Sequence, residues 1–324
     1  MDPFSEVLGG LRLRGAVYFR AALSAPWAIT TPRATQMAPH LSPGAQHLVI
    51  YHLVVDGALR ARTAGGDSVD LEPGDIVVFP HGDEHELSAG TGGLSIDVMP
   101  VMEKIAAKDL SPLRAGGGGH TSQLVCGFMV CDPLLCGPIL DGLPAVMKVN
   151  VRADTAGRWL ESSILHMANE AASNQPGSEA MLAKLSEALF VDTLRRFVSG
   201  LSDQSTGWLA GARDSAVGRA LALMHARPAH SWTIAELSEA IGISRSVLIE
   251  RFTRYLGEPP MAYLAGWRMR LSAQALVSTP KGVAEIASDV GYESEAAFNR
   301  AFKRAFGTPP ARYRRDQREA ARLA

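Results

Sequence analysis

The chain has 324 residues, a formal net charge of −1 and 47% hydrophobic residues, which is the composition of an ordinary globular protein of two or three domains. Its apolar runs are far shorter than the roughly 18 residues of a membrane span, and its N-terminus lacks the basic start and apolar core of a secretory signal. We therefore expect a cytoplasmic protein without a membrane partner.

Charge is divided unevenly along the chain. Residues 213–324 contain 17 Lys and Arg against 11 Asp and Glu, a net charge of +6, whereas residues 1–212 have a net charge of −7. A basic C-terminal part joined to an acidic N-terminal part predicts that only the C-terminal part contacts a polyanion such as DNA.

The first part, residues 1–150, is predicted to be rich in β-strands. Short apolar or alternating segments are separated there by turn signals such as Pro73-Gly74-Asp75. We expect strands at Gly15–Phe19, His47–Val55, Ser68–Leu71, Ile76–Phe79, Leu94–Pro100 and Gln123–Cys131. Many short strands at this spacing predict a barrel or a sandwich.

The chain has three cysteines, two in the last of these segments and one just after it. Their odd number does not support a disulfide framework, and the five-residue spacing of Cys126, Cys131 and Cys136 is not that of a Cys-x-x-Cys pair. Cys126 alternates with Leu124 and Phe128, which predicts that it packs in the core. Plain burial is one interpretation of these thiols, and oxidant sensing is the other.

Residues 151–205 are predicted to form two helices separated by Asn174–Gly177. The second helix has more apolar surface than a single exposed helix needs. We expect it to pair with the same helix of a second copy in a homodimer, with Leu182, Leu185 and Leu189 at the seam. The alternative is that this helix only covers the barrel.

The last part, residues 206–324, contains an internal repeat. Residues 234–244 (IAELSEAIGIS) align with residues 283–294 (VAEIASDVGYES). Residues 248–260 (LIERFTRYLGEPP) then align with residues 298–310 (FNRAFKRAFGTPP). A repeat that preserves caps, turns and apolar spacing predicts two copies of one supersecondary unit.

Each copy has the pattern of a helix-turn-helix, at about 231–257 and about 281–307. A short apolar helix ends at a glycine, which is Gly242 in the first copy, and a serine, Ser244 or Ser294, caps a second helix. Two such units in tandem predict a DNA-binding protein that reads two stretches of one duplex.

The second helix of each unit is basic and amphipathic. Leu248 and Phe252 are expected to face the core in the first copy, as are Phe298 and Phe302 in the second, so the residues between them face outward. The predicted base contacts, on the first turns, are Arg245, Ser246, Ile249, Glu250, Glu295, Ala296, Asn299 and Arg300. The predicted phosphate contacts are Arg251, Arg254, Lys303, Arg304, Arg312 and Arg314.

The two units are joined by a predicted linker helix over residues 260–276. About 16 residues with a rise of 1.5 Å each span about 25 Å. With the width of the units themselves, this helix can separate the two recognition helices by about 34 Å, which is one turn of DNA.

Residues 214–315 resemble the AraC/XylS family of bacterial transcription regulators. The matching segments are IAELSEAIGISRSVLIERFTRYLGEPPMAYL and VAEIASDVGYESEAAFNRAFKRAFGTPPARYRR. The resemblance implies binding to asymmetric, often direct-repeat DNA sites, work with RNA polymerase and, for most of the family, activation of transcription. Ile249 and Glu250 depart from the pattern, because a more polar or basic pair is expected there.

The segment Pro73–His85 resembles the second motif of cupin barrels, and residues 10–132 with the helices after them look like the cupin-type sensor of some AraC-like regulators. In cupin enzymes the histidine of this motif binds a metal together with a His-x-His pair, which this sequence lacks. The resemblance implies that His85 faces the interior of the barrel.

Histidines are the candidate residues of the sensor. His47 and His52 lie five residues apart, so along one strand their side chains point to opposite faces, and only one can join His85 inside. His52 and His85 are the candidate effector pocket. A transition metal held by His52, His85 and either His81 or His47 is one interpretation. Local hydrogen bonds or a metal-free pocket are the other.

The sequence thus predicts an α+β protein with a cupin-like sensor at 1–150, a helical dimerisation region at 151–205 and an all-α DNA-binding domain at 206–324. The predicted function is a transcription regulator, not an enzyme, that acts as an activator and responds to a small-molecule or redox effector at the barrel. No cofactor is certain, and a transition metal is the one candidate. The alternatives are a cupin metalloenzyme with an appended helical domain and a DNA-binding protein without an effector.

Overall fold

The computed structural model describes residues 13–42, 45, 47–92, 94–173, 175–202 and 204–323. They form two compact units. The β-rich unit contains residues 13–132 and 143–200, and the helical unit contains residues 133–142 and 201–323. The helices predicted as a separate dimerisation region therefore belong to the β-rich unit, and a short segment before them belongs to the helical unit.

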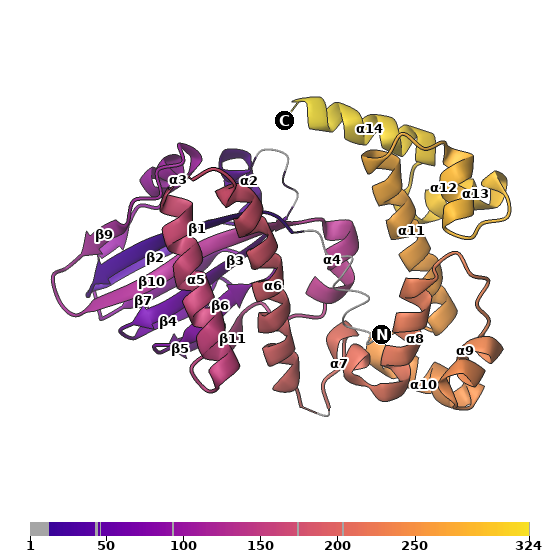
Figure 1. Cartoon of the computed structure of the whole chain (residues 1–324), viewed down its shortest axis with the longest axis horizontal. Coiled ribbons are helices and arrows are strands. Elements are labelled where there is room, and N and C mark those ends of the chain that lie inside the picture. The colour runs from indigo at the N-terminus through magenta and orange to yellow at the C-terminus, as the bar shows by residue number, and fades with distance from the viewer. Residues whose placement is uncertain are drawn as a thin grey trace. The chain divides into compact units, whose positions relative to one another are not determined.

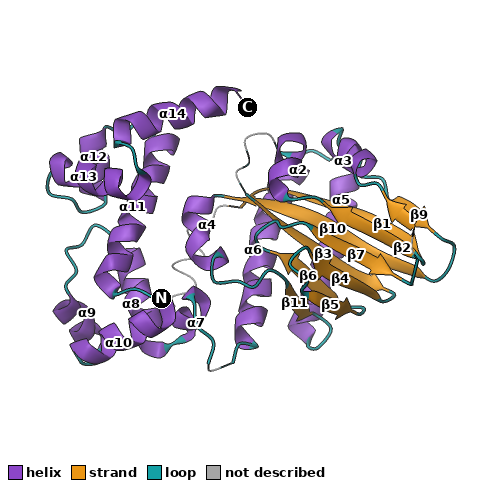
Figure 2. Cartoon of the chain, turned by 180° about the vertical axis from the view of Figure 1, so that it is seen from behind, coloured by secondary structure: helices purple, strands orange, loops and turns teal. Residues whose placement is uncertain are grey.

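Two sheets build the β-rich unit (Figure 2). In spatial order, the six-stranded sheet consists of β11 (Met147–Asn150), β6 (Asp75–Phe79), β3 (Leu48–Asp56), β10 (Thr121–Cys131), β1 (Leu13–Ser24) and β9 (Leu113–Gly116). The five-stranded sheet consists of β5 (Ser68–Leu71), β4 (Leu59–Thr63), β7 (His85–Ala89), β2 (Trp27–Thr31) and β8 (Leu94–Ile96). The β-rich fold expected from the turn spacing is confirmed.

The main core lies between these sheets, because alternate residues of each strand point inward. Ile50 and Val54 of β3, for example, join Trp27 and Leu87 of the other sheet in one buried cluster. Two short helices, α2 (Ala34–Leu41) and α3 (Met99–Ala106), pack against each other beside this core.

The strand predicted at Leu94–Pro100 is only half correct. β8 ends at Ile96, and the carboxylate of Asp97 then accepts a hydrogen bond from the backbone of Met99 at 2.9 Å, where α3 begins. An aspartate that bonds a backbone amide two residues on favours a turn into a helix over a continued strand. Pro100 fits the first turn of a helix, where its missing N–H costs nothing.

Two long helices, α5 (Thr155–Ser173) and α6 (Ser178–Ser199), run side by side across the six-stranded sheet (Figure 1). The hydroxyl of Tyr18 on β1 lies 2.6 Å from that of Ser186 on α6 and ties the helix to the sheet. The structure therefore supports the interpretation in which the second helix covers the barrel.

The predicted dimer seam needs correction for this reason. Leu182 and Leu189 have only 6% and 5% of their surface exposed, because α6 turns them toward the sheet and the neighbouring helix. Only Leu185 remains partly exposed. Two of the three leucines are thus used inside the chain and are unavailable to a second copy.

Nine helices of the described residues form the helical unit, and α11 is its axis (Figure 1). They are α4 (Pro133–Leu140), α7 (Trp208–Arg213), α8 (Ser215–Ala226), α9 (Ile234–Ile241), α10 (Arg245–Leu256), α11 (Pro260–Ser278), α12 (Val283–Asp289), α13 (Glu295–Phe306) and α14 (Pro310–Leu323). One helix-turn-helix (α9, α10) lies near one end of α11, and the other (α12, α13) lies near the opposite end. The predicted linker helix is confirmed and extends to Ser278. No helix among the described residues is long and apolar enough to cross a membrane.

Candidate DNA-binding interface and sensor cavity

The first helix-turn-helix follows the sequence pattern closely. Gly242 ends α9 with a φ of 83°, a left-handed conformation that favours glycine. The hydroxyl of Ser244 then accepts a hydrogen bond from the backbone of Val247 at 3.3 Å and caps α10. Leu248 and Phe252 of α10 are completely buried. The opposite face of α10 is consequently left to solvent.

The second helix-turn-helix repeats this arrangement. The hydroxyl of Ser294 accepts a hydrogen bond from the backbone of Ala297 at 3.2 Å and caps α13, whose Phe298 and Phe302 are completely buried. The Phe302 ring also lies 5.4 Å from that of Tyr313 on α14. An aromatic cluster thus fixes the rotation of α13 about its axis.

The predicted base-contacting residues lie on the outer faces of these two helices. Arg245, Ser246, Ile249, Glu250, Glu295, Ala296 and Arg300 are exposed, and Asn299 is half-buried. Each set occupies the N-terminal turns of its helix, the part that enters the major groove in helix-turn-helix proteins. The outward orientation is therefore as expected, and contact with bases stays a prediction.

Four of the six predicted phosphate contacts, Arg254, Lys303, Arg304 and Arg312, are exposed. Arg251 is different, because it forms an ion pair with Asp214, whose side chain has 4% of its surface exposed. Asp214 also accepts hydrogen bonds from the backbone of Ala216 and Val217 and so caps α8. A nearly buried carboxylate needs a cationic partner, so Arg251 links α10 to α8 and is removed from the predicted phosphate set.

Arg314 is also occupied inside the unit. Its guanidinium donates to the carbonyl oxygens of Leu276 at 2.9 Å and Lys281 at 2.5 Å, which bracket the loop between α11 and α12. This loop has backbone acceptors that no helix satisfies, and the arginine satisfies them. We therefore correct the predicted phosphate role of Arg314 to a structural one.

A similar clamp, which the sequence did not reveal, holds the loop between α8 and α9. Arg268 of α11 donates to the carbonyl oxygens of Pro228 and His230, both at 2.7 Å. The turn of the second helix-turn-helix meets the same loop, because a Cβ added to Gly291 would lie 2.4 Å from the carbonyl oxygen of Ala229. These contacts join the two DNA-reading units into one body with fixed spacing.

A largely buried cluster of hydrogen-bonded side chains lies where α7, α8 and α11 meet. The indole of Trp208 donates to the hydroxyl of Tyr263 at 2.8 Å, and Nε2 of His225 lies 2.8 Å from the same hydroxyl. The His225 ring stacks on Trp267 with centroids 4.2 Å apart. Desolvation lowers the pKa of His225 to about 3, so the ring is neutral at physiological pH.

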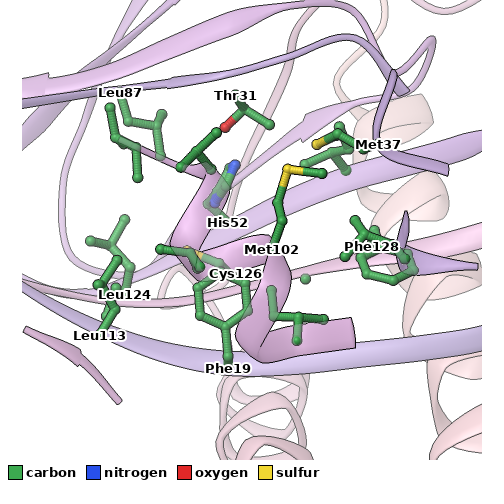
Figure 3. A pocket seen from close by; sticks show the side chains of 18 of the residues that line it. Phe19, Thr31, Met37, His52, Leu87, Met102, Leu113, Leu124, Cys126 and Phe128 are labelled. Carbon is green, nitrogen blue, oxygen red and sulfur yellow. The ribbon is translucent and has the colours of Figure 1, made fainter. Parts of the chain in front are cut away.

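The β-rich unit contains a cavity of about 70 Å³. Side chains from both sheets and from α2 and α3 line it, including Met37 and Met102 (Figure 3). Among the lining residues only Thr31, His52 and Cys126 have polar side chains. The helical part of the lining was missed from the sequence, since the residues that begin α3 were assigned to a strand.

His52 and His85 come together as predicted, with their Nε2 atoms 3.1 Å apart. This bond joins the six-stranded sheet to the five-stranded sheet, and the His85 ring also stacks on Phe79 with centroids 3.6 Å apart. Burial, together with the neighbouring imidazole, holds the pKa of His52 well below its usual value. Burial also lowers the pKa of His85 to about 4.

The predicted metal site is not assembled. Nε2 of His81 lies 3.0 Å from the carbonyl oxygen of Leu143, and Nε2 of His47 lies 2.7 Å from that of Pro80. No group of three or more His, Cys, Asp or Glu side chains arranged for a metal occurs in the described residues. The loop geometry turns His81 and His47 to backbone acceptors, so the three-histidine site is corrected to a histidine pair.

All three cysteines are buried and none of them forms a disulfide, as the burial interpretation expected. Cys126 lies opposite His52 on the adjacent strand and is 6% exposed. Burial raises the pKa of this thiol to about 12, which disfavours the thiolate that oxidants attack. The core position of Cys126 is confirmed, and oxidant sensing gains no support from its surroundings.

Comparison with known proteins agrees with this architecture. Residues 2–199 match the Cupin family, and residues 237–316 match a helix-turn-helix domain family. A putative AraC-like transcription regulator of Streptomyces antibioticus is 32% identical, over 97% of this chain and 99% of its own length. The HTH-type transcriptional regulator AlkR of Acinetobacter baylyi is 28% identical over 97% and 99%. The RCS-specific HTH-type transcriptional activator RclR of Escherichia coli is 24% identical over 99% and 100%.

A cupin-type β-rich unit followed by two helix-turn-helix units is the arrangement of a transcription regulator. Its N-terminal domain and its DNA-binding domain are parts of the same chain. The chain belongs to the AraC-like family of transcription regulators, and it binds double-stranded DNA through its helical unit.

Proposed function

We propose that α10 and α13 enter successive major grooves on one face of a DNA duplex and read an asymmetric two-part site. The observation that carries this proposal is the pair of outward-facing helix N-termini near opposite ends of α11. At 1.5 Å per residue, the 19 residues of α11 span about 28 Å, which suits units one helical turn of DNA apart.

Base contacts come from the exposed first turns of both helices, and Arg300 is the strongest candidate. Its exposed guanidinium on α13 suits a bidentate contact to guanine, while the neighbouring Asn299 suits adenine. Arg254, Lys303, Arg304 and Arg312 supply phosphate contacts, which add affinity without sequence information.

Control by an effector at the β-rich unit is the second element of the proposal. The cavity beside His52 supports it, because an enclosed apolar pocket with a few polar groups is a typical ligand site. The chain itself connects the cavity lining to the helical unit. β10 contributes Leu124 and Phe128 to the cavity lining, and the chain continues from its end into α4, whose Leu134 packs against the core of the second helix-turn-helix.

The regulator acts on chromosomal DNA in the cytoplasm and contacts RNA polymerase as an activator. The family membership supports this, as does a relative that is named as an activator. A homodimer belongs to the proposal too, although its surface excludes Leu182 and Leu189. The partly exposed Leu185 on α6 and Trp159 on α5, 54% exposed, support that surface, which sedimentation of the full chain can test.

The test of DNA reading is a matched pair of variants in α13. Sites are first selected from genomic fragments with the full chain, and affinities are then measured at several salt concentrations. Arg300→Ala should cost about 1–3 kcal/mol on the best site and relax one base position. Arg304→Ala, the phosphate control, should weaken binding to all sequences equally and lower the salt slope by about 1. If both variants leave site preference and affinity unchanged, the proposed role of α13 is wrong.

A further inference from the structure

The cavity of the β-rich unit contains an unsatisfied polar atom. Nδ1 of His52 has no hydrogen-bond partner within the described part of the chain. Water cannot easily replace the missing partner, because the residue is only 6% exposed. Buried polar atoms without partners are rare in folded proteins, because each one loses its bond to water. The same ring lines the cavity, beside Met102 and Cys126 (Figure 3).

The neighbouring bonds determine whether this atom donates or accepts. Nδ1 of His85 lies 2.9 Å from the carbonyl oxygen of Asp83, which only accepts, so this nitrogen donates. The other nitrogen of a neutral His85 ring, Nε2, is then an acceptor. Nε2 of His52, at 3.1 Å, must therefore donate to it, and Nδ1 of His52 is left with a lone pair. The unsatisfied atom is therefore a hydrogen-bond acceptor, and a ligand that donates a hydrogen bond would satisfy it.

The rest of the lining excludes a charged ligand. It contains no Asp, Glu, Lys or Arg, and its remaining polar side chains are those of Thr31 and Cys126. An ion would lose its hydration there without a counter-charge, at a cost that a neutral molecule avoids. The low pKa values of His52 and His85 mean that the pair itself carries no compensating charge near neutral pH.

The size of the cavity limits the ligand as well. A volume of about 70 Å³ is roughly half that of an apolar protein cavity of about 150 Å³ that binds benzene. Met37 and Met102 belong to the lining, and methionine side chains are flexible enough to widen it by changing rotamer. A molecule of about six carbon atoms is therefore the appropriate probe.

We propose that this cavity binds a small, uncharged and mostly apolar molecule that donates one hydrogen bond to Nδ1 of His52. The proposal rests on the effector control proposed above and names the chemistry of the effector: an alcohol or a phenol, in preference to a hydrocarbon, an ether or an acid. His52 acts as the specificity-determining residue, and the methionines adapt the cavity to the carbon skeleton.

The test compares molecules that are matched in size. The full chain is titrated calorimetrically with 1-hexanol, its isomer dipropyl ether, hexane and hexanoate, and with phenol, anisole, toluene and benzoate. We expect the alcohol and the phenol to bind at least ten-fold more tightly than the ether and hydrocarbon of their series, and the two acids not to bind. Equal affinity for hexanol, dipropyl ether and hexane would overturn the proposal.

Variants assign the preference to one atom. His52→Phe keeps a ring of similar size but removes the acceptor, so the ten-fold preference should disappear while toluene still binds. His166→Phe, an equivalent change at an exposed position on α5, should leave the preference intact. Ala21→Leu, which fills space in the lining, should weaken binding of every probe. An unchanged circular dichroism spectrum and a cooperative thermal unfolding transition verify that each variant is folded. A preference that survives His52→Phe would contradict the role of His52.

Ligand binding by the cavity and control of DNA binding by the ligand are measured separately. The titrations contain no DNA, so absence of the preference overturns the ligand chemistry and leaves regulation by another effector intact. Operator affinity is then measured with saturating hexanol or phenol. Tight, His52-dependent binding that leaves operator affinity unchanged would support the cavity chemistry and overturn the proposed control.

Discussion

The two helix-turn-helix units share their buried residues and differ on the surface that faces outward. Leu248 and Phe252 of α10 correspond to Phe298 and Phe302 of α13, and all four are completely buried. At the outward positions Ile249 and Glu250 of α10 correspond to Asn299 and Arg300 of α13. Packing constrains the buried positions in both copies, whereas the outward positions are free to fit different DNA sequences. The comparison predicts that Asn299 and Arg300 of the second unit read bases with polar groups, whereas Ile249 at the corresponding position of the first unit makes an apolar contact.

The units also differ in how they are attached to the rest of the helical unit. α10 is held to α8 by the ion pair of Arg251 with Asp214, and α8 also holds His225, which contacts the hydroxyl of Tyr263. α13 is held by an aromatic cluster, and its preceding turn touches Ala229 at Gly291. The same supersecondary unit is thus stabilised by charge in one copy and by close backbone packing in the other.

The largest effect is expected at the two turn glycines. Both have positive φ, so alanine at Gly242 should cost about 1–2 kcal/mol of stability through the left-handed backbone alone. Alanine at Gly291 should cost about 2–5 kcal/mol, because its Cβ would also meet the backbone of Ala229 at 2.4 Å. Thermal unfolding of the two variants measures the difference.

Gly242→Ala is the internal control, since a Cβ there meets no atom within 4 Å. Gly291→Ala should in addition weaken binding to the two-part DNA site, because its clash displaces one unit relative to the other. Equal stability loss in the two variants would mean that the contact between Gly291 and Ala229 does not fix the spacing.

Within the helical unit, a histidine-dependent pH effect should be confined to the part that holds the first helix-turn-helix, because residues 281–324 contain no histidine. The pKa of His225 falls from 6.5 to about 3 on folding, so between those values the unfolded chain takes up a proton that the folded chain refuses. Stability should therefore fall as the pH falls through this window, by up to about 1.4 kcal/mol per pH unit.

Amide hydrogen exchange of the full chain measures this difference. The protection factors of the α8 amides, which correct for the slower intrinsic exchange at low pH, should fall below pH 6.5 before those of the α13 amides do. His225→Gln, which stays neutral and can still bond the hydroxyl of Tyr263, should remove most of the pH dependence. A parallel loss of protection in both helices, in the wild type and in His225→Gln, would assign the acid sensitivity to other groups.

Local sequence signals predicted the fold of the repeats well. The Ser244 and Ser294 caps, the left-handed Gly242 and the buried face of each recognition helix depend on residues within one helical turn, so spacing alone reveals them. The inward position of His85 followed from the resemblance of its motif to cupin barrels, and the structure buries this side chain as expected.

Contacts between distant segments explain what the sequence did not reveal. Arg251 and Arg314 looked like phosphate ligands because they are basic residues next to a recognition helix, but their partners lie 37 and 33 or more positions away. Leu182 and Leu189 were assigned to a dimer because periodicity shows that a helix has an apolar face and does not show what covers it. The bond between His52 and His85 joins two sheets, so only the folded chain reveals the unsatisfied Nδ1 atom.

A smaller effect should separate the two arginines of α10. Arg251→Ala leaves Asp214 without its cation and should cost about 1–2 kcal/mol of stability, since the arginine is itself 42% exposed and water weakens the pair. Arg254→Ala should instead lower DNA affinity with little change in unfolding temperature, because its side chain is exposed. A reversed pattern in unfolding and DNA titration would return Arg251 to the phosphate set.

The smallest effect concerns the one apolar side chain among the predicted base contacts of the first recognition helix. Ile249 is 40% exposed on α10, where an apolar side chain can contact the C5 methyl group of thymine. Replacement of thymine by uracil at one position of the first half-site should then cost about 0.5–1 kcal/mol of binding free energy. The Ile249→Ala variant should bind the thymine and uracil sites equally, while the Arg300→Ala variant should still distinguish them. If no thymine in the first half-site shows this dependence, the predicted contact between Ile249 and a thymine methyl group is wrong.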